Sequence, residues 1–337
     1  MPKEWLNKLN KYVQDGYIRV ATHPTLPLKI YNYTPKTEFE EKWDDITIKC
    51  RGLVLDNNGE IIVNSPPKFF NDFDKHAPKI EWGKAIITAK EDGYYISITQ
   101  SSKYGFLITS RGSFDNKYVD AAKQLTGDIS IKPDKTLFCE LLQDFPGDES
   151  TIVTKHLIPE IKCWAIRDID GKEYNISESP IKPVQKFTVK EAKDYLAKEV
   201  EGVVLQDPRT YERVKCKTNW FFNMHRVISD CTKKRVWEII KDGGLVEELD
   251  IPDEFMQQML DWEKEIRAEI EQMYIEAHSY AHIYESYTDK ELGLENPIPK
   301  PYDKMVWCIR KDKEQQCLDL IIREIGQSLK SSAIIDT

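Results

Sequence analysis

A lysine followed by a short acidic turn is the first feature of this sequence that could do chemistry. Lys90 ends the apolar stretch 86–89 and opens the tetrapeptide Lys90-Glu91-Asp92-Gly93. A lysine amine is a nucleophile only when it is deprotonated, and partial desolvation or neighbouring cations favour that neutral form. An amine at the end of a rigid strand would be aimed at a ligand, and Gly93 would let the backbone turn close to that ligand. The alternative is an ordinary surface hairpin, since turns of this composition are common.

Two isolated carboxylates and one large ring follow, each within an apolar segment. Glu140 is either a charge at a strand edge or an acceptor for a ribose hydroxyl. Trp164 is either a core residue or a platform on which a purine base could stack. Glu201 precedes Gly202 and could ligate a metal ion or lie beside a phosphate.

Two lysines alternate in the segment 213–217, at positions 215 and 217. Side chains two residues apart project from the same face of a strand, so Lys215 and Lys217 would lie side by side. That face is either solvated or a clamp on an α-phosphate. His278 and His282 stand four apart on an expected helix, but no Glu between them completes the zinc-protease pattern, so they are interpreted as surface residues.

The order of these segments resembles the five core motifs of the covalent nucleotidyltransferases. This superfamily contains the ATP-dependent DNA ligases, the RNA ligases and the mRNA capping enzymes. The matching residues are Lys90-x-Asp92-Gly93, Phe138-x-Glu140, the strand around Trp164, Glu201-Gly202-Val203-Val204 and Lys215-x-Lys217. Each motif is short and weak alone, whereas five in this order are a specific pattern.

Four more segments resemble the RNA ligase 1 family of T-even phage type, namely residues 50–54, 67–71, 109–113 and 219–221. DNA ligases and capping enzymes follow the last motif with a β-barrel domain, whereas this chain turns helical after Lys217. The resemblance covers roughly residues 45–225 by motif. It extends to the rest of the chain only through its helical character.

The resemblance implies which residues handle the phosphates of ATP. Lys90 would attack the α-phosphate and become covalently loaded with AMP. Arg51 and Lys68 would hold the β- and γ-phosphates, so that pyrophosphate is oriented as the leaving group. Lys215 and Lys217 would bind the α-phosphate.

It also implies contacts to the nucleoside and to a metal ion. Glu140 would contact the ribose, Trp164 would lie against adenine, and Glu201 would help to place Mg²⁺. Further nucleotide contacts are expected from Phe70, Ala89 and Arg111. The family often has lysine where this chain has Arg111, and the two cations differ in hydrogen-bond geometry.

The implied reaction joins RNA ends. AMP passes from Lys90 to a 5′-phosphate end, and a 3′-hydroxyl then attacks this activated end to seal the strand, as in the repair of broken RNA, with tRNA as one candidate. Two alternatives stay open. The chain could be a DNA ligase or capping-type transferase, or an idle RNA-binding relative, although the intact Lys90, Glu201 and Lys215-x-Lys217 set speaks against idleness.

The 337 residues suggest two domains, and both the pattern and the charge change along the chain. Short β-rich segments at 53–55, 61–63, 85–89, 94–99, 106–109, 203–205 and 213–217 predict an antiparallel sheet, with a helix at 189–197. After about residue 223, helical spacing recurs at 233–241, 255–277 and 317–325. We therefore expect an α+β fold: an antiparallel-sheet nucleotidyltransferase (adenylyltransferase) domain at 1–225, followed by an all-helical domain at 226–337.

The charge split bears on where RNA would be held. Residues 226–337 contain 15 Lys and Arg against 24 Asp and Glu, which accounts for the whole net charge of −9, and residues 1–225 hold 33 of each sign. Because RNA phosphates are gripped by cations, the first domain should hold most of the RNA.

The remaining features indicate where the protein works. Seven cysteines without a Cys-x-x-Cys pair fit free thiols in a reducing cytoplasm, which would be the host cytoplasm if the gene is phage-encoded. No apolar run approaches the length of a membrane span, and the start has no apolar signal core.

Overall fold

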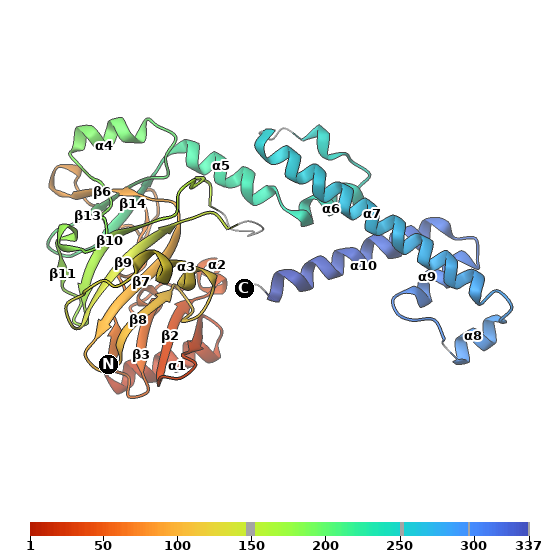
Figure 1. The fold of residues 1–337 in the computed structure, drawn as a ribbon, viewed down its shortest axis with the longest axis horizontal. Helices are drawn as coiled ribbons and strands as arrows, with labels where there is room; N and C mark the ends of the chain where they lie inside the picture. The colour runs from red at the N-terminus through yellow and green to blue at the C-terminus, as the bar shows by residue number, and fades with distance from the viewer. Residues whose placement is uncertain (146–151, 250–252, 296, 336–337) are drawn as a thin grey trace. The chain divides into compact units, whose positions relative to one another are not determined.

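Short β-rich segments joined by tight turns fold into three sheets in the first part of the chain (Figure 1). The computed structural model describes residues 1–145, 152–249, 253–295 and 297–335. Contacts divide the chain into two compact units, Met1–Met224 and His225–Thr337. No helix within the described residues is both long and apolar enough to cross a membrane.

The first sheet has the order β1-β2-β3-β4 and is antiparallel throughout. Its strands are β1 (Ile18–Thr22), β2 (Leu28–Tyr33), β3 (Arg51–Asp56) and β4 (Ile61–Val63). One face packs on helix α1 (Lys3–Gln14), where Leu9, Ile18 and Leu53 are buried. The predicted segments 53–55 and 61–63 pair as the β3–β4 hairpin, and the Asn-Gly dipeptide at 58–59 lies in its turn.

The second sheet has the order β11-β10-β9-β7-β8. Its strands are β7 (Tyr94–Ser101), β8 (Gly105–Ser110), β9 (Lys135–Leu142), β10 (Glu160–Asp168) and β11 (Glu173–Tyr174). Helix α3 (Lys117–Thr126) covers one face, with Val119 packed among the apolar side chains of the strands. The opposite face shares a core with the first sheet, in which Tyr95 and Phe138 meet Leu28 and Val54.

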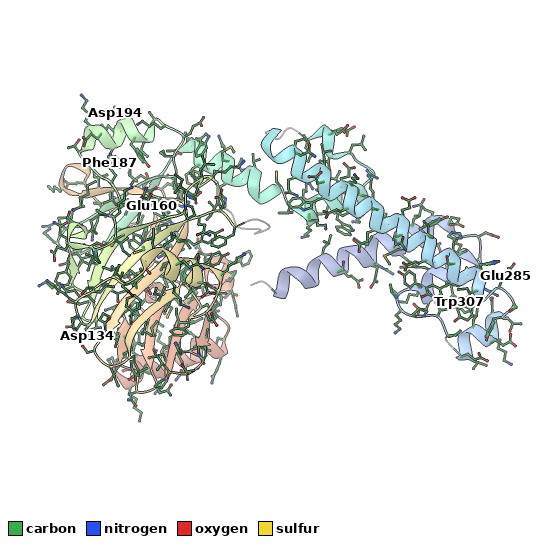
Figure 2. The ribbon with its side chains drawn as sticks, in the orientation of Figure 1. Asp134, Glu160, Phe187, Asp194, Glu285 and Trp307 are labelled. Atoms are coloured by element: carbon green, nitrogen blue, oxygen red, sulfur yellow. The ribbon has the colours of Figure 1, made fainter. Side chains whose placement is uncertain are left out.

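The third sheet has the order β12-β6-β13-β14-β5 and carries Lys90, Lys215 and Lys217. Its strands are β5 (Phe70–Asn71), β6 (Ile86–Lys90), β12 (Lys186–Phe187), β13 (Gly202–Gln206) and β14 (Arg213–Lys217). Helix α4 (Val189–Leu196) covers the face that carries Ile87 and Val203. Phe187 packs against Tyr195 of this helix, with ring centroids 4.7 Å apart (Figure 2).

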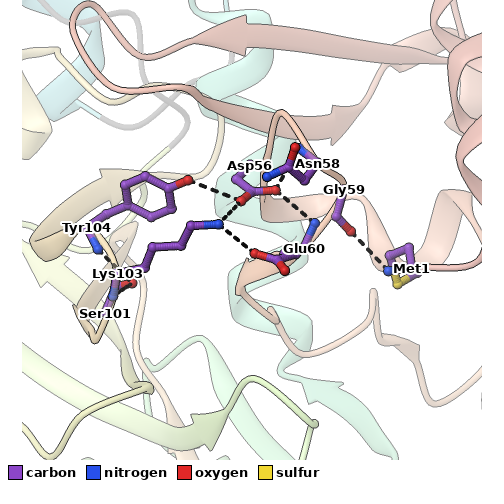
Figure 3. A network of polar contacts seen from close by, with 8 residues as sticks. All are labelled: Met1, Asp56, Asn58, Gly59, Glu60, Ser101, Lys103 and Tyr104. Atoms are coloured by element: carbon purple, nitrogen blue, oxygen red, sulfur yellow. Dashed lines mark hydrogen bonds and ion pairs between the residues drawn. The ribbon is translucent and has the colours of Figure 1, made fainter.

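A buried carboxylate ties the first sheet to the second (Figure 3). Asp56, at the end of β3, accepts hydrogen bonds from Lys103 Nζ at 2.6 Å and from the Tyr104 hydroxyl at 3.1 Å, both in the β7–β8 turn. Lys103 also reaches Glu60 at 2.6 Å. The N-terminal amine of Met1 donates to the carbonyl of Gly59 in the same turn as Glu60. The two hairpins are therefore held together by charge as well as by apolar packing.

The second unit is helical, as the spacing predicts. Its helices are α6 (Lys233–Lys241), α7 (Asp253–Ile283), α8 (Asp289–Glu295), α9 (Tyr302–Ile309) and α10 (Glu314–Ile335), while α5 (Asn219–Asp230) spans the division between the units. Trp237 of α6 donates its indole N–H to the Ile322 carbonyl of α10 at 2.7 Å. A Cβ at Gly326 would lie 2.3 Å from the Trp237 ring, so a glycine is needed there. Trp307 of α9 packs in a smaller core beside α8 (Figure 2).

Two features differ from the sequence-based expectation. The third sheet is not wholly antiparallel, because the two-residue strand β5 runs parallel to β14. Helices α1 and α3, and the short α2 (Pro35–Phe39), lie in the part of the chain for which the sequence predicts mainly strands. Short 3-10 turns lie at 47–49, 82–84, 176–178 and 246–248.

Candidate active site

The register of the third sheet places the two lysine motifs side by side. Gly202 of β13 pairs with Lys90 of β6 on one side and with Lys217 of β14 on the other. Residues directly opposite each other on neighbouring strands share a face of the sheet, so Lys90 and Lys217 point the same way. Lys215 lies two residues further along the same face of β14.

Glu201 joins these two lysines. One carboxylate oxygen, Oε2, lies 2.8 Å from Lys90 Nζ, and the other, Oε1, lies 2.8 Å from Lys217 Nζ. The Glu201 side chain is only 4% exposed, so the carboxylate is held almost entirely by its two cations. A buried charge of this kind is tolerated only when it is paired.

Gly202 is required beside this carboxylate. Its φ is +152°, and a Cβ there would lie 2.1 Å from the Cys216 carbonyl oxygen of the neighbouring strand. Any side chain would therefore push β13 away from β14 and move Glu201 with it. The close approach of β14 therefore explains why a glycine follows Glu201.

The carboxylates around Lys90 keep it protonated in this structure. Burial of the ammonium lowers its pKa, but the charges of Glu201 and Glu140 outweigh burial and raise the pKa above its ordinary value. Lys90 must therefore lose a proton before it can act as a nucleophile. The physical reason is that two acidic side chains, contributed from distant segments, face the amine.

Lys215 behaves in the opposite way. Burial, followed by the charges of Lys90, Lys217 and other nearby cations, lowers its pKa to about 7. Its Nζ lies 5.7 Å from the centroid of the Phe69 ring, and no acidic partner is found for it among the described residues. An anionic ligand arriving here would meet a cation that no carboxylate already neutralises.

Glu140 lies on β9 opposite Tyr95 of β7 and Lys162 of β10. Burial raises the pKa of its carboxyl to about 8, although Lys90 acts in the other direction. Gly93 makes this approach possible, because a Cβ there would lie 2.9 Å from Glu140 Cγ and 2.5 Å from the Leu141 carbonyl oxygen. Burial thus favours the protonated carboxyl, which can donate a hydrogen bond, whereas the charge of Lys90 favours the carboxylate.

Trp164 is the extra residue of a β-bulge in β10. The pairing with β9 shifts between Cys163 and Ala165, which redirects the intervening side chain. Its ring lies 5.8 Å from that of Phe138 and 6.1 Å from that of Phe69. The indole N–H is buried without a hydrogen-bond partner in the described structure. Trp164 is accordingly part of an aromatic wall rather than an isolated platform.

A second bulge redirects Arg51. Gly52, with φ +87°, is skipped in the pairing of β2 with β3, so Arg51 lies opposite Asn32 on the face that adjoins the second sheet. The Arg51 guanidinium lies 5.1 Å from the centroid of Tyr95 and 5.5 Å from that of Phe69. Its Nη1 is buried and has no partner among the described residues.

Lys68 is enclosed by aromatic rings. Its Nζ lies 4.5 to 5.4 Å from the ring centroids of Trp43, Tyr33 and Phe70, so Phe70 lies beside a cation. Glu38 of α2 accepts a hydrogen bond from Lys68 at 2.9 Å. A phosphate reaching Lys68 would have to compete with this carboxylate.

Ala89 and Arg111, the two remaining residues predicted to contact the nucleotide, lie at the edges of the site. Ala89 is buried on the face of β6 opposite Lys90, so it can meet a ligand only through its backbone. Arg111 follows β8, is exposed, and lies 5.8 Å from the Tyr33 centroid. The charges of Lys90, Lys217, Lys68 and Arg51 all lower the pKa of Lys215. Arg51 also lowers the pKa of Glu140 and of Arg111. These cations therefore lie around the same part of the site.

Sequence reasoning missed an ion pair beside the nucleophile. Lys162 of β10 lies 2.7 Å from Glu91, and both side chains are mostly buried. The carboxylate of Asp92 accepts the backbone N–H groups of Val153 and Thr154 at 2.6 and 2.9 Å. Glu91 and Asp92 belong to a recognised motif, but their partners are long-range and leave no local signal.

Glu201 is the carboxylate that would have to bind a magnesium ion at this site. The described residues contain no group of three or more His, Cys, Asp or Glu that could hold a metal alone. A carboxylate oxygen is a suitable ligand for Mg²⁺, which usually binds one or two carboxylates together with substrate phosphates. Both oxygens of Glu201 bond lysines, so a metal ion would have to displace one ammonium.

Comparison with known proteins finds similarity in structure but not in sequence. No protein-family model matches the chain, and neither does any curated protein, so membership of the RNA ligase 1 family gains no support there. An archaeal ATP-dependent RNA ligase is similar at 14% identity and a TM-score of 0.48, over 77% of this chain and 75% of that one. A putative ATP-dependent DNA ligase from Aquifex aeolicus is similar at 15% identity and a TM-score of 0.43, over 76% and 70%. An RNA ligase from Naegleria gruberi with pyrophosphate follows at 14% identity and a TM-score of 0.32, over 67% and 83%.

Proposed function

We propose that this protein is an ATP-dependent RNA ligase that works through a covalent lysyl-AMP on Lys90. The observation that carries the proposal is the buried Glu201 carboxylate, held between Lys90 and Lys217 at 2.8 Å each. Glu201 holds Lys90 at the end of β6, near Lys215, which has no acidic partner among the described residues. In this position Lys90 would attack a phosphate that Lys215 and Lys217 bind.

In the first step the Lys90 ammonium passes a proton to the Glu201 carboxylate, whose Oε2 lies 2.8 Å away, and the neutral Nζ attacks the α-phosphorus of ATP. A nitrogen–phosphorus bond forms, the bond to the bridging oxygen breaks, and pyrophosphate leaves with the electron pair. In this proposal Lys215 and Lys217, which share one face of β14, would bind the α-phosphate, and Arg51 and Lys68 would hold the departing phosphates. Positioning and charge neutralisation supply most of the catalysis in reactions of this type.

The same residues serve the two later steps. A 5′-phosphate end of RNA attacks the lysyl-AMP and takes AMP, which returns the amine of Lys90. A 3′-hydroxyl then attacks the activated 5′-phosphorus, a phosphodiester bond forms and AMP leaves. Glu140, as a neutral carboxyl, is suited to donate a hydrogen bond to a ribose oxygen, and Trp164 contributes to the wall on which adenine would lie.

Glu201 is the residue that would hold Mg²⁺, together with phosphate oxygens of the nucleotide. The ion would neutralise phosphate charge. The ion would have to compete with Lys90 and Lys217 for the Glu201 oxygens, so its arrival and the release of an ammonium are linked.

We infer RNA rather than DNA ends from the part of the chain that follows β14. It is helical in the described residues, whereas DNA ligases and capping enzymes carry a β-barrel domain there. The segments at 50–54, 67–71 and 109–113 support kinship with the RNA ligase 1 family and with it a role in RNA repair, tRNA included. They contain Arg51, Lys68 and Arg111, all of which border the site.

The test is to incubate the protein with α-labelled ATP and magnesium and to look for label that survives denaturation. We expect an adduct in the wild type and none in Lys90→Ala. No adduct in the wild type, or the same adduct in Lys90→Ala, would overturn the proposal. Labelled GTP in parallel would identify a guanylyltransferase, and nicked RNA against nicked DNA would separate the two kinds of ligase.

A further inference from the structure

Phe73 is a large ring that the fold leaves in solvent. It lies in the turn 72–76, directly after the edge strand β5, and it is 72% exposed. One side of the ring is nevertheless supported, because it lies against Phe222 of α5, with centroids 5.7 Å apart and planes inclined by 57°. Both rings belong to the first compact unit. The exposed part of Phe73 remains open to a ligand.

Hydrogen bonds fasten the turn that carries this ring. Asp72 donates its backbone N–H to the carbonyl of Lys215 at 2.9 Å. The carboxylate of Asp74 accepts the backbone N–H of His76, also at 2.9 Å. A ligand that packs on Phe73 would therefore meet a ring on an ordered turn, so little conformational entropy would be lost on binding.

Both rings are connected to β14, the strand that carries Lys215 and Lys217. Phe73 follows Asp72, which is bonded to the backbone of Lys215. Phe222 lies in the first turn of α5, and this helix begins two residues after Lys217. Lys215 has no acidic partner among the described residues. The exposed ring thus lies next to a strand with cations that can bind phosphates.

The size and the charge of the turn favour a base over other ligands. A stable protein interface covers about 800 Å² on each partner, whereas one aromatic side chain buries about 150–250 Å². Phe73 is flanked in the sequence by Asp72 and Asp74, whose carboxylates would repel a phosphate. A base carries no charge and presents a flat face of about the area of one ring, so it fits this position.

We propose that Phe73, backed by Phe222, is a platform on which an unpaired base of the RNA strand stacks next to the adenylylation site. The inference rests on the proposed function and deepens it, since Phe73 belongs to none of the motifs described above. Single strands are held by cations that bind the backbone together with rings that stack on the bases, and every base has a face that can stack.

The experiment compares Phe73→Leu, which keeps an apolar side chain but removes the ring, with Phe73→Tyr, which keeps the ring. Phe106→Leu is the matched control, because Phe106 is 44% exposed and lies near the end of β8 that is farther from Arg111. The melting temperature checks that each variant is folded.

Three quantities are measured for each protein. The first is the rate of adduct formation with labelled ATP. The second is the affinity for a 5′-phosphorylated single-stranded RNA oligonucleotide over a range of salt concentrations. The third is the fluorescence of a 2-aminopurine base placed at successive positions of that oligonucleotide, since stacking on a ring quenches this base.

We expect Phe73→Leu to weaken RNA binding about tenfold at every salt concentration, because one base loses its stacking partner. RNA affinity should fall about tenfold more than the rate of adduct formation does. The salt slope should stay at the wild-type value, since no phosphate contact is lost. Quenching at the stacked position should disappear in Phe73→Leu and persist in Phe73→Tyr, and Phe106→Leu should match the wild type.

Three results would overturn the platform. One is a Phe73→Leu protein with wild-type RNA affinity and quenching. Another is an equal loss in adduct formation and in RNA affinity, which would mean that the substitution disturbs the nucleotide site. The third is a lower salt slope, which would mean that phosphate contacts are lost instead of stacking. Absence of an adduct in the wild type would refute the proposed function, and the quenching would still be read independently.

Discussion

Glu201 Oε2 lies 2.8 Å from Lys90 Nζ, although the two residues are 111 positions apart in the sequence. The same carboxylate holds Lys217, so one buried acid sets the position of both the nucleophile and a phosphate-binding lysine. This arrangement makes Glu201 the residue whose loss should disturb the site most without touching Lys90 itself.

Glu201→Gln should lower the rate of lysyl-AMP formation by on the order of a hundredfold or more, because a neutral amide cannot hold two ammonium groups or a magnesium ion. The rate is measured with α-labelled ATP at saturating magnesium. Glu199→Gln, an exposed carboxylate two residues earlier, is the control and should behave as the wild type. A Glu201→Gln protein with the wild-type rate would remove Glu201 from the site.

Lys215→Met should stabilise the protein while it abolishes adduct formation. Burial and neighbouring cations lower the pKa of Lys215 to about 7, whereas in the unfolded chain a lysine titrates near 10.4. The folded state therefore bears a penalty that is full below pH 7 and fades as the pH rises towards 10.4.

The gain in the free energy of unfolding should be on the order of 1–3 kcal/mol at pH 7 and should shrink by pH 10. Denaturant unfolding at the two pH values measures it. Lys193→Met, at an exposed position of α4, should show no such pH dependence. A destabilised Lys215→Met protein would mean that Lys215 has a compensating partner.

Gly202→Ala should destabilise the protein by more than about 3 kcal/mol, since the new Cβ would overlap the Cys216 carbonyl and the backbone cannot move without breaking the β13–β14 pairing. Gly105→Ala is the matched control. Gly105 also has a positive φ, +76°, but nothing lies within 4 Å of its Cβ position, so about 1 kcal/mol is expected there. Equal losses for the two variants would show that close packing at Gly202 is not the cause.

Asp56→Asn should lower the free energy of unfolding by about 1–2 kcal/mol at neutral pH. Burial raises the pKa of Asp56, but hydrogen bonds from Lys103, the Glu60 amide and Tyr104 lower it to about 2. A depressed carboxyl pKa contributes stability that is present above the unfolded value near 3.9 and is lost as the pH falls towards 2. The difference between variant and wild type should therefore narrow below pH 4, and a constant difference from pH 6 to pH 2.5 would contradict this account.

The basic triplet of α6 should contribute little to RNA binding. Lys233 lies 2.8 Å from Glu265, and Lys234 and Arg235 lie 3.8 and 3.5 Å from Glu238, so their charges are locally neutralised. Changing all three to Ala should alter the salt slope of RNA binding by less than about one unit. A drop of two or more would mean that the acidic helical unit grips the strand after all.

The sequence alone was sufficient for the fold class and for the strands that carry the site. The hairpin at 53–63, the strands 86–90 and 213–217 and the helix after 189 all follow from local composition and turn residues. It was not sufficient for the two-residue strand β5, whose parallel pairing with β14 depends on a contact 144 residues away. Local propensity has no means of predicting such a pairing.

At the site, residue types and their order determined which side chains to examine, because a nucleophilic amine, paired lysines and isolated carboxylates are recognisable as chemistry wherever they lie. Only the tertiary structure decided their state. It set Glu201 between Lys90 and Lys217, surrounded Lys68 with rings and paired it with Glu38, and left Lys215 without a counter-ion among the described residues. The reason is physical: the pKa and the reach of a side chain depend on charges brought from distant strands, and these are absent from any stretch of sequence read by itself.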